Sequence, residues 1–85
     1  MAWMVVLSRN AEKSLRNLPG DVQRWAVKII AALHHGPRIS GAEKLQAPGK
    51  LFRVRKGDYR LTFAVEDGEI RVIRIGHRRD VYRDL

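Results

Sequence analysis

The last third of the chain constrains the fold more than any other part. Three β-rich segments occur there, at residues 51–55, 59–66 and 69–75. The turn sequences Lys56-Gly57-Asp58 and Asp67-Gly68 separate them. Short turns of this kind between β-rich segments are typical of hairpins. The pattern therefore predicts a three-stranded antiparallel meander.

The side chains of the meander alternate between two kinds. In the first segment, Phe52 and Val54 alternate with Arg53 and Arg55. The second segment alternates in the same way, with Arg60 on its polar side. Because successive residues of a strand point to opposite faces of the sheet, we expect one apolar face and one basic face.

A short strand and a first helix are predicted at the start of the chain. Val5-Val6-Leu7 is β-prone, and Ser8 directly after it is suited to cap a helix that runs to about Leu18. Pro19-Gly20-Asp21 then interrupts the helical pattern. The chain therefore begins with a strand followed by one helix of a hairpin.

A second helix is predicted between Val22 and Leu33, where apolar residues recur at i, i+3 and i+4. Gly36-Pro37 ends it, because glycine suits a left-handed cap and proline cannot continue the hydrogen-bond ladder. Residues 38–49 are predicted to be a connecting loop with at most one short extended stretch.

We expect an α+β fold, with the N-terminal strand and the helical hairpin packed on one face of a small antiparallel sheet. A chain of 85 residues has room for a single domain, spanning residues 1–85.

The chain is strongly basic, with 17 Lys and Arg against 9 Asp and Glu and a net charge of +8. This balance favours an anionic partner such as nucleic acid, an anionic membrane surface or an acidic protein.

Without cysteine there is neither a disulfide framework nor a thiolate metal site. No apolar run approaches the roughly 18 residues of a membrane span, and residues 1–7 lack the features of a signal peptide. We therefore expect a cytoplasmic protein.

Two short runs narrow the kind of anion. Gly57-Asp58-Tyr59-Arg60 and the tail from Gly76 to Tyr82 place arginines beside side chains that can carry a proton. Guanidinium groups bind phosphate in pairs of hydrogen bonds, and histidine exchanges a proton near neutral pH. The combination suggests RNA as the ligand. Structural roles remain open, since Tyr82 could anchor the C-terminus and His77 could be a turn residue.

The chain resembles the RelE/ParE superfamily of toxins from toxin–antitoxin systems over nearly its whole length. The resemblance is carried by Ala11–Leu15, Leu18-Pro19, the run Phe52–Leu61, Val72 and the Gly76–Tyr82 tail. It implies a RelE-like microbial ribonuclease fold and the toxin of a type II system. The RelE-like branch cleaves messenger RNA in the ribosomal A site, which inhibits translation. The ParE-like branch poisons DNA gyrase and has no nuclease chemistry.

In the RelE-like branch, the reaction is metal-independent and needs no cofactor, because a ribose 2′-hydroxyl attacks the adjacent phosphate. The resemblance implies these catalytic residues: Arg53, Arg60, Arg78, Tyr82 and His77. Further RNA contacts are expected from Lys50, Arg55, Lys56, Arg74 and Arg79. Which residue acts as general base or acid stays open among Tyr82, His77 and Glu43.

The resemblance also implies partners. These are a RelB-like antitoxin encoded by an adjacent gene, the ribosome with its mRNA, and operator DNA reached only through the antitoxin complex. No membrane partner is expected. Two alternatives remain: a ParE-like gyrase inhibitor, and an inactive module that binds antitoxin or operator DNA without toxicity.

Overall fold

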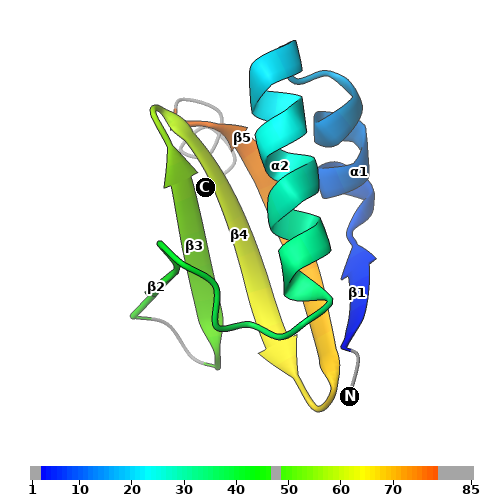
Figure 1. Cartoon of the computed structure of the whole chain (residues 1–85), viewed down its shortest axis with the longest axis vertical. Helices are drawn as coiled ribbons and strands as arrows, with labels where there is room; N and C mark the ends of the chain where they lie inside the picture. The colour runs from blue at the N-terminus through cyan, green and yellow to red at the C-terminus, as the bar shows by residue number, and fades with distance from the viewer. Residues whose placement is uncertain (1–2, 47–48, 79–85) are drawn as a thin grey trace.

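A five-stranded sheet with two helices on one face forms the protein in the computed structural model, which describes residues 3–46 and 49–78 (Figure 1). The strands are β1 (Met4–Leu7), β2 (Glu43–Lys44), β3 (Leu51–Lys56), β4 (Tyr59–Glu66) and β5 (Glu69–His77). The helices are α1 (Arg9–Arg16) and α2 (Gly20–Leu33). Across the sheet the strands follow the order β1-β5-β4-β3-β2.

The predicted meander is confirmed as β3, β4 and β5, joined by antiparallel pairing. Gly57 and Gly68, in the two turns between these strands, adopt φ values of 58° and 69°. Glycine is suited to both places because it has no Cβ to clash in the left-handed region. β5 continues to His77, two residues beyond the predicted Ile75.

The sequence predicted an antiparallel sheet, but the observed sheet is mixed. β1 runs parallel to β5, with Met4 opposite Glu69 and Leu7 opposite Val72. Parallel neighbours require a long connection, and here the chain from α1 to β4 lies between them. β2 is the short extended stretch expected within residues 38–49, and it pairs antiparallel to β3.

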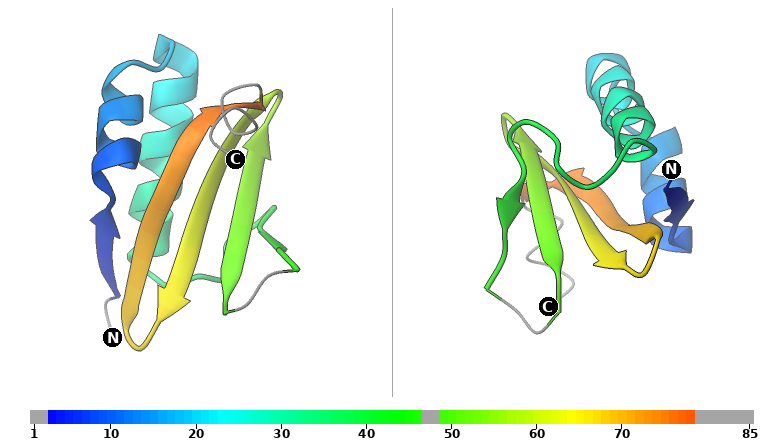
Figure 2. Two further views of the ribbon diagram at one scale, coloured as in Figure 1. Left: turned by 180° about the vertical axis from the view of Figure 1, so that it is seen from behind. Right: turned by 60° about the horizontal axis from the view of Figure 1, so that its bottom comes forward.

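The predicted helical hairpin is confirmed with small changes at its ends. Ser8 caps α1, because its hydroxyl accepts a hydrogen bond from the Ala11 N–H at 3.0 Å. α1 ends at Arg16, before the predicted Leu18, and α2 begins at Gly20, before the predicted Val22. Both helices lie on the same face of the sheet (Figures 1 and 2).

The hydrophobic core lies between this hairpin and the sheet. Its buried apolar members are Ala11, Val22, Ala26, Leu33, Val54, Leu61, Phe63, Ile70, Val72 and Ile75. Partly buried Leu15, Leu18, Trp25, Ile29 and Ile30 of the helical hairpin pack against them. No helix of the described residues covers the opposite face of the sheet (Figure 2).

A β-bulge interrupts the pairing of β4 with β5. Thr62 lies opposite Arg74 and Phe63 opposite Val72, so Ile73 is an extra residue in β5. The Ser8 hydroxyl donates a hydrogen bond of 2.6 Å to the Ile73 carbonyl. Because of the extra residue, Val72 and Ile75 both face the core, and Arg74 faces the open side.

We expect Ser8→Ala to lower the free energy of unfolding by about 2 kcal/mol, because it removes both the helix cap and the bond to the bulge. Urea denaturation followed by circular dichroism measures this change. Ser40→Ala, at an exposed serine outside the helices and strands, is the matched control and should stay within about 0.5 kcal/mol of the wild type. Equal losses in the two variants would contradict the structural role of Ser8.

Candidate functional site

Five strand arginines point to the face of the sheet that the helices leave open. One of them, Arg71 of β5, lies toward β1 and pairs with Glu69 at 3.6 Å. The other four lie together: Arg53 and Arg55 on β3, Arg60 on β4 and Arg74 on β5. Each alternates with a buried residue of the core, so the strand pleat directs the guanidinium groups away from it. We call these four residues the arginine face. The expectation that Arg53, Arg55 and Arg60 share the open side of the sheet is confirmed.

The strand register brings these like charges close together. Arg55 lies directly opposite Arg60, and Arg53 lies opposite Thr62, which in turn lies opposite Arg74. Like charges directly opposite each other destabilise an antiparallel pair by roughly 0.2–1 kcal/mol. A bound anion would relieve this repulsion, so the arrangement favours anion binding.

One carboxylate lies against the arginine face. Glu43 of β2 is the register partner of Arg53. Its Oε1 is 3.8 Å from Arg53 Nη2 and 3.5 Å from Arg55 Nε. The Glu43 side chain is 50% exposed, so solvent screens both ion pairs and each contributes little stability. Glu43 thus places a carboxylate among the arginines.

Two buried guanidinium nitrogens of the face have no hydrogen-bond partner among residues 3–46 and 49–78. The Nε atoms of Arg53 and Arg60 are buried and unpaired within the described structure. An unpaired buried donor costs about 1–3 kcal/mol, and such groups are rare in folded proteins. Phosphoryl oxygens accept the paired hydrogen bonds that a guanidinium offers. The unpaired donors are therefore a second feature that favours an anion at this face.

The family resemblance predicts that His77 is a catalytic residue together with these arginines. In the structure, His77 lies at the end of β5, beside Tyr59 and Asp58. It is the register partner of Tyr59, and the two rings meet edge to face with centroids 5.2 Å apart. His77 Nε2 is 3.9 Å from Asp58 Oδ2. Strand alternation directs its side chain to the helix side of the sheet, opposite to the neighbouring Arg60.

The remaining predicted residues divide into three groups. Lys56 ends β3 at a position that alternates with Arg53 and Arg55, which directs it to the helix side of the sheet. Lys50 directly precedes β3 and lies on the same side, beside Phe52 and Val65. Arg78 is exposed, and its backbone N–H donates to the Asp58 carbonyl at 2.7 Å. Arg79 and Tyr82 lie outside the described residues.

Strand alternation alone did not predict that Arg74 lies on the arginine face. Strict alternation through β5 would put residues 70, 72 and 74 on one side, yet Ile70 and Val72 are buried and Arg74 is not. The bulge at Ile73 is the cause. The spacing of the apolar residues Ile70, Val72 and Ile75 carries this signal, because it changes from two residues to three.

Residues 3–46 and 49–78 contain neither a cluster of metal ligands nor a membrane-spanning helix. No three histidine or acidic side chains gather there as ligands for a metal ion. None of the helices in these ranges is both long and apolar enough to cross a membrane.

Comparison with known proteins gives a family. The family model described as the ParE toxin of the type II toxin–antitoxin system parDE matches residues 5–82. Toxin RelE of Mycobacterium tuberculosis is 30% identical over an alignment of 88 positions. The alignment covers 95% of this chain and 87% of that protein.

Solved structures give the same result for the fold. The archaeal RelE-RelB complex from Pyrococcus horikoshii has a chain with a TM-score of 0.76 and 28% identity, covering 92% of this chain and 97% of that one. The isolated E. coli RelE toxin has a TM-score of 0.78 and 24% identity, covering 99% of this chain and 100% of that one. The second likeness concerns the fold alone.

We expect inorganic phosphate to stabilise the protein by binding the arginine face. At ten times its dissociation constant, a ligand adds about 1.4 kcal/mol to the free energy of unfolding. In a domain of this size that corresponds to a rise of roughly 6–11 °C in Tm. The measurement is thermal unfolding with and without phosphate, at constant ionic strength.

Two variants test where the phosphate binds. Arg60→Gln should lose most of the rise in Tm, whereas Lys28→Gln should keep it, because Lys28 is exposed on α2, far from β4 in the sequence and on the helix layer. An equal rise in wild type and both variants would mean that phosphate stabilises the protein without using the arginine face.

Proposed function

Since this chain belongs to the RelE/ParE family of type II toxin–antitoxin toxins, we propose that it is an endoribonuclease that cleaves messenger RNA on the ribosome. The observation that carries the proposal is the arginine face, with its two unpaired guanidinium nitrogens. Arginine is the residue best suited to bind a phosphodiester, since its planar donors match two phosphoryl oxygens at once.

The proposed reaction is an internal transfer of the phosphoryl group. The ribose 2′-oxygen attacks the adjacent phosphorus as it loses its proton, and the bond from phosphorus to the 5′-oxygen breaks. The products are a 2′,3′-cyclic phosphate and a 5′-hydroxyl, so the leaving oxygen must gain a proton. The chain therefore needs a proton acceptor, a proton donor and positive charge near the phosphoryl oxygens.

The positive charge would come from the arginine face. Arg55 and Arg60 are direct cross-strand partners, and Arg53 is the diagonal neighbour of Arg60. Diagonal neighbours are separated by roughly 7–8 Å between their backbone positions, within the reach of two arginine side chains toward one phosphate. These donors would act most strongly when negative charge accumulates on the phosphoryl oxygens in the transition state.

Glu43 is the proton acceptor that the described geometry supports best. Its carboxylate lies 3.5 Å from Arg55 and 3.8 Å from Arg53, on the side of the sheet where the phosphate would bind. His77 belongs to the opposite side, beside Tyr59, which supports it less as a direct participant. Tyr82 stays an alternative for either proton transfer.

The ribosome would supply what a domain of 85 residues lacks. Attack by the 2′-oxygen requires it to lie in line with the leaving 5′-oxygen, and free RNA rarely holds that geometry. Fixing reactants in position contributes several kcal/mol to catalysis. We therefore propose that the message is presented in the ribosome, in the cytoplasm, and that the toxin adds mainly charge and proton transfer.

The chain should also have an antitoxin as its partner. The solved complexes from Pyrococcus horikoshii and Methanococcus jannaschii contain RelB together with RelE. A RelB-like antitoxin with an acidic segment would complement the net charge of +8 on this chain. Such a segment would inhibit cleavage if it covered the arginine face, and operator DNA would be reached only through the complex.

A second candidate function is inhibition of DNA gyrase. The observation that favours it is the family model, which describes a ParE toxin and matches residues 5–82. This function would not need Glu43 as a base, and it would leave messenger RNA intact.

We expect the wild-type protein to cut messenger RNA in a cell-free translation extract, with cuts mapped by primer extension. Arg60→Ala should reduce the cleavage rate about 10²- to 10³-fold, the usual cost of removing one donor that stabilises transition-state charge. Arg60→Lys should recover only part of this loss, because lysine keeps the charge without the paired donors. Lys28→Ala, at the exposed lysine of α2, is the control and should cleave like the wild type.

The gyrase alternative is tested with the same proteins. Intact message in the extract, combined with loss of supercoiling activity when wild-type protein is added to purified gyrase, would reject the nuclease and favour the ParE-like function.

We expect Glu43→Gln to separate binding from chemistry. The change removes a proton acceptor and a negative charge while keeping the size of the side chain. If Glu43 is the base, cleavage should fall about 10²- to 10⁴-fold, although RNA affinity at low salt stays the same or rises. Glu12→Gln, at an exposed carboxylate paired with Arg16 on α1, is the matched control. Unchanged or faster cleavage in Glu43→Gln would instead make Glu43 a counter-ion of the arginines.

A further inference from the structure

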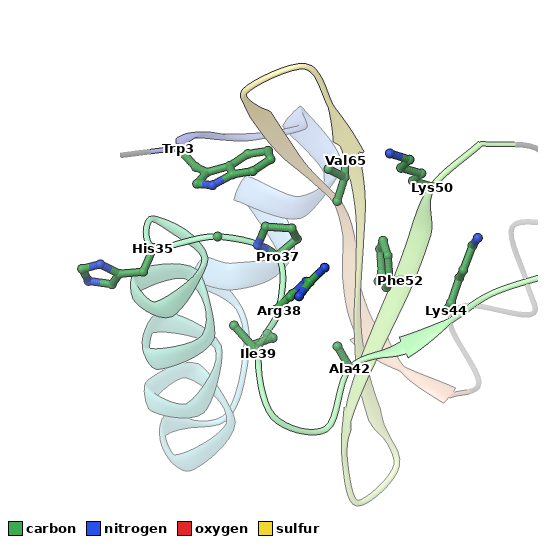
Figure 3. Close-up of a pocket in the computed structure, with 11 residues that line it drawn as sticks. Trp3, His35, Pro37, Arg38, Ile39, Ala42, Lys44, Lys50, Phe52 and Val65 are labelled. Atoms are coloured by element: carbon green, nitrogen blue, oxygen red, sulfur yellow. The ribbon is translucent and has the colours of Figure 1, made fainter. Parts of the chain in front are cut away.

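The helix side of the sheet carries a pocket at each end of β4. The first, of about 710 Å³, lies between the segment after α2, Trp3 and the strands β3 and β4 (Figure 3). We call it the Trp3 pocket. Its walls are apolar, and Arg38, Lys44 and Lys50 lie at its rim. The second, of about 360 Å³, lies between α1 and the end of β5. We call it the α1 pocket, and it borders the arginine face.

The α1 pocket forms because β1 is shorter than β5. β1 ends at Leu7, opposite Val72, so among the described residues no strand lies beside residues 74–77 on the side away from β4. α1 lies along this edge instead, and the helix and its cap contribute Asn10, Lys13, Ser14 and Asn17 to the lining. An unpaired strand edge presents backbone N–H and C=O groups. One wall of the pocket is therefore a polar strand edge.

The α1 pocket is continuous with the arginine face. Arg74 belongs to that face and also lines the pocket. Gly76, which lines the pocket as well, is the register partner of Arg60. Neighbouring strands are about 4.8 Å apart, so the pocket begins one strand away from Arg60. Because glycine has no side chain, Gly76 places no barrier between the two sites.

Two aromatic rings line the α1 pocket. Tyr59 and His77 meet edge to face, with centroids 5.2 Å apart. One ring of such a pair uses only its edge in the contact, which leaves its faces for stacking with a further ring. In the Trp3 pocket, by contrast, the ring of Phe52 already stacks on that of Phe63. Nucleotide bases stack on open aromatic faces, so the α1 pocket suits a base better.

The charges of the α1 pocket favour a neutral group inside it and a phosphate at its rim. Lys13 and Arg74 line the pocket, and no carboxylate of the described residues does. α1 ends beside the pocket, and the C-terminal end of a helix carries partial negative charge, which disfavours a phosphate close to it. The Asn17 amide nitrogen donates to the Lys13 carbonyl at 3.0 Å. Its amide oxygen is thus the acceptor that Asn17 offers to a ligand, and it suits the amino group of a base.

We propose that the α1 pocket binds one base of a single-stranded RNA whose backbone lies on the arginine face. The base stacks on Tyr59 or His77, its edge bonds to the amides of Asn10 and Asn17, and Lys13 contacts a phosphate at the rim. This inference rests on the proposed function, because it adds a base subsite for the same RNA. Phosphate contacts carry no sequence information directly, whereas contacts to a base edge do. The pocket would therefore give the toxin a preference among the nucleotides that flank the cleaved bond.

An RNA that cannot be cleaved tests the subsite without relying on catalysis. The probe is a fluorescein-labelled 2′-O-methyl tetranucleotide with abasic sugars and a single adenine, because the blocked 2′-oxygen cannot attack. The same tetranucleotide without any base is the reference. Affinities are measured by fluorescence polarisation at low salt. We expect the single adenine to strengthen binding to the wild type about tenfold, within the usual range for one stacked base.

Neutral variants locate the base. Asn10→Ala with Asn17→Ala removes the amides of the pocket without changing net charge, and should reduce the gain from adenine about threefold to tenfold, the effect of one or two lost hydrogen bonds. Gln46→Ala, at an exposed amide that does not line the pocket, is the matched control and should keep the full gain. Arg60→Gln should weaken both probes alike, because it removes a phosphate contact and no base contact.

Circular dichroism verifies that each variant is folded, and Asn10→Ala alone, which leaves the Asn17 cap in place, replaces the double variant if that one is unstable. Equal affinity of the wild type for the two probes, or an undiminished gain in the pocket variant, would overturn the base subsite. Weaker binding by Arg60→Gln would then still support the arginine face as an RNA site. A gain that depends on the pocket amides, together with uncut message in the translation extract, would support the subsite and reject the nuclease.

Discussion

Burial of one side of the meander holds the arginines on its other side. Val54, Leu61 and Ile75 are buried under the helices, and each is adjacent in sequence to an arginine of the open face. A slip of one residue in register would exchange the two sides, exposing the core and burying guanidinium groups. The hydrophobic free energy that stabilises the fold thus also determines which cations meet on the surface. Stability and the geometry of the candidate site cannot be varied separately along these strands.

The meander, the helical hairpin and the sidedness of Arg53, Arg55 and Arg60 were predictable because each follows from local periodicity or turn chemistry. The parallel pairing of β1 with β5 was not, since alternation reports the face of a residue and not the strand that lies beside it. The residues predicted to contact RNA lie on two sides of the sheet. Lys50 and Lys56 are close to the arginines in sequence, but their side chains lie on the helix side. Glu43 was already a candidate general base or acid from the sequence. Its position beside two arginines could not be predicted, because it depends on the pairing of β2 with β3.

The two cationic features differ in ways that match different ligands. The arginine face consists of guanidinium groups, and Arg55 lies directly opposite Arg60 in it. The Trp3 pocket is concave and apolar inside, and lysine predominates at its rim. Guanidinium groups present the paired donors that suit phosphate, whereas an apolar pocket with lysines at its rim does not present them.

The bond from Ser8 to Ile73 joins residues that are 65 positions apart in the chain. β1 depends on the same late segment, because β5 is its neighbour in the sheet. During synthesis the first strand and the cap of α1 must therefore wait until β5 has been made before they find their partners. Contacts of such long range slow folding. The arginine face thus reaches its finished geometry only after residues 69–77 have been made, and a product truncated before β5 would lack it.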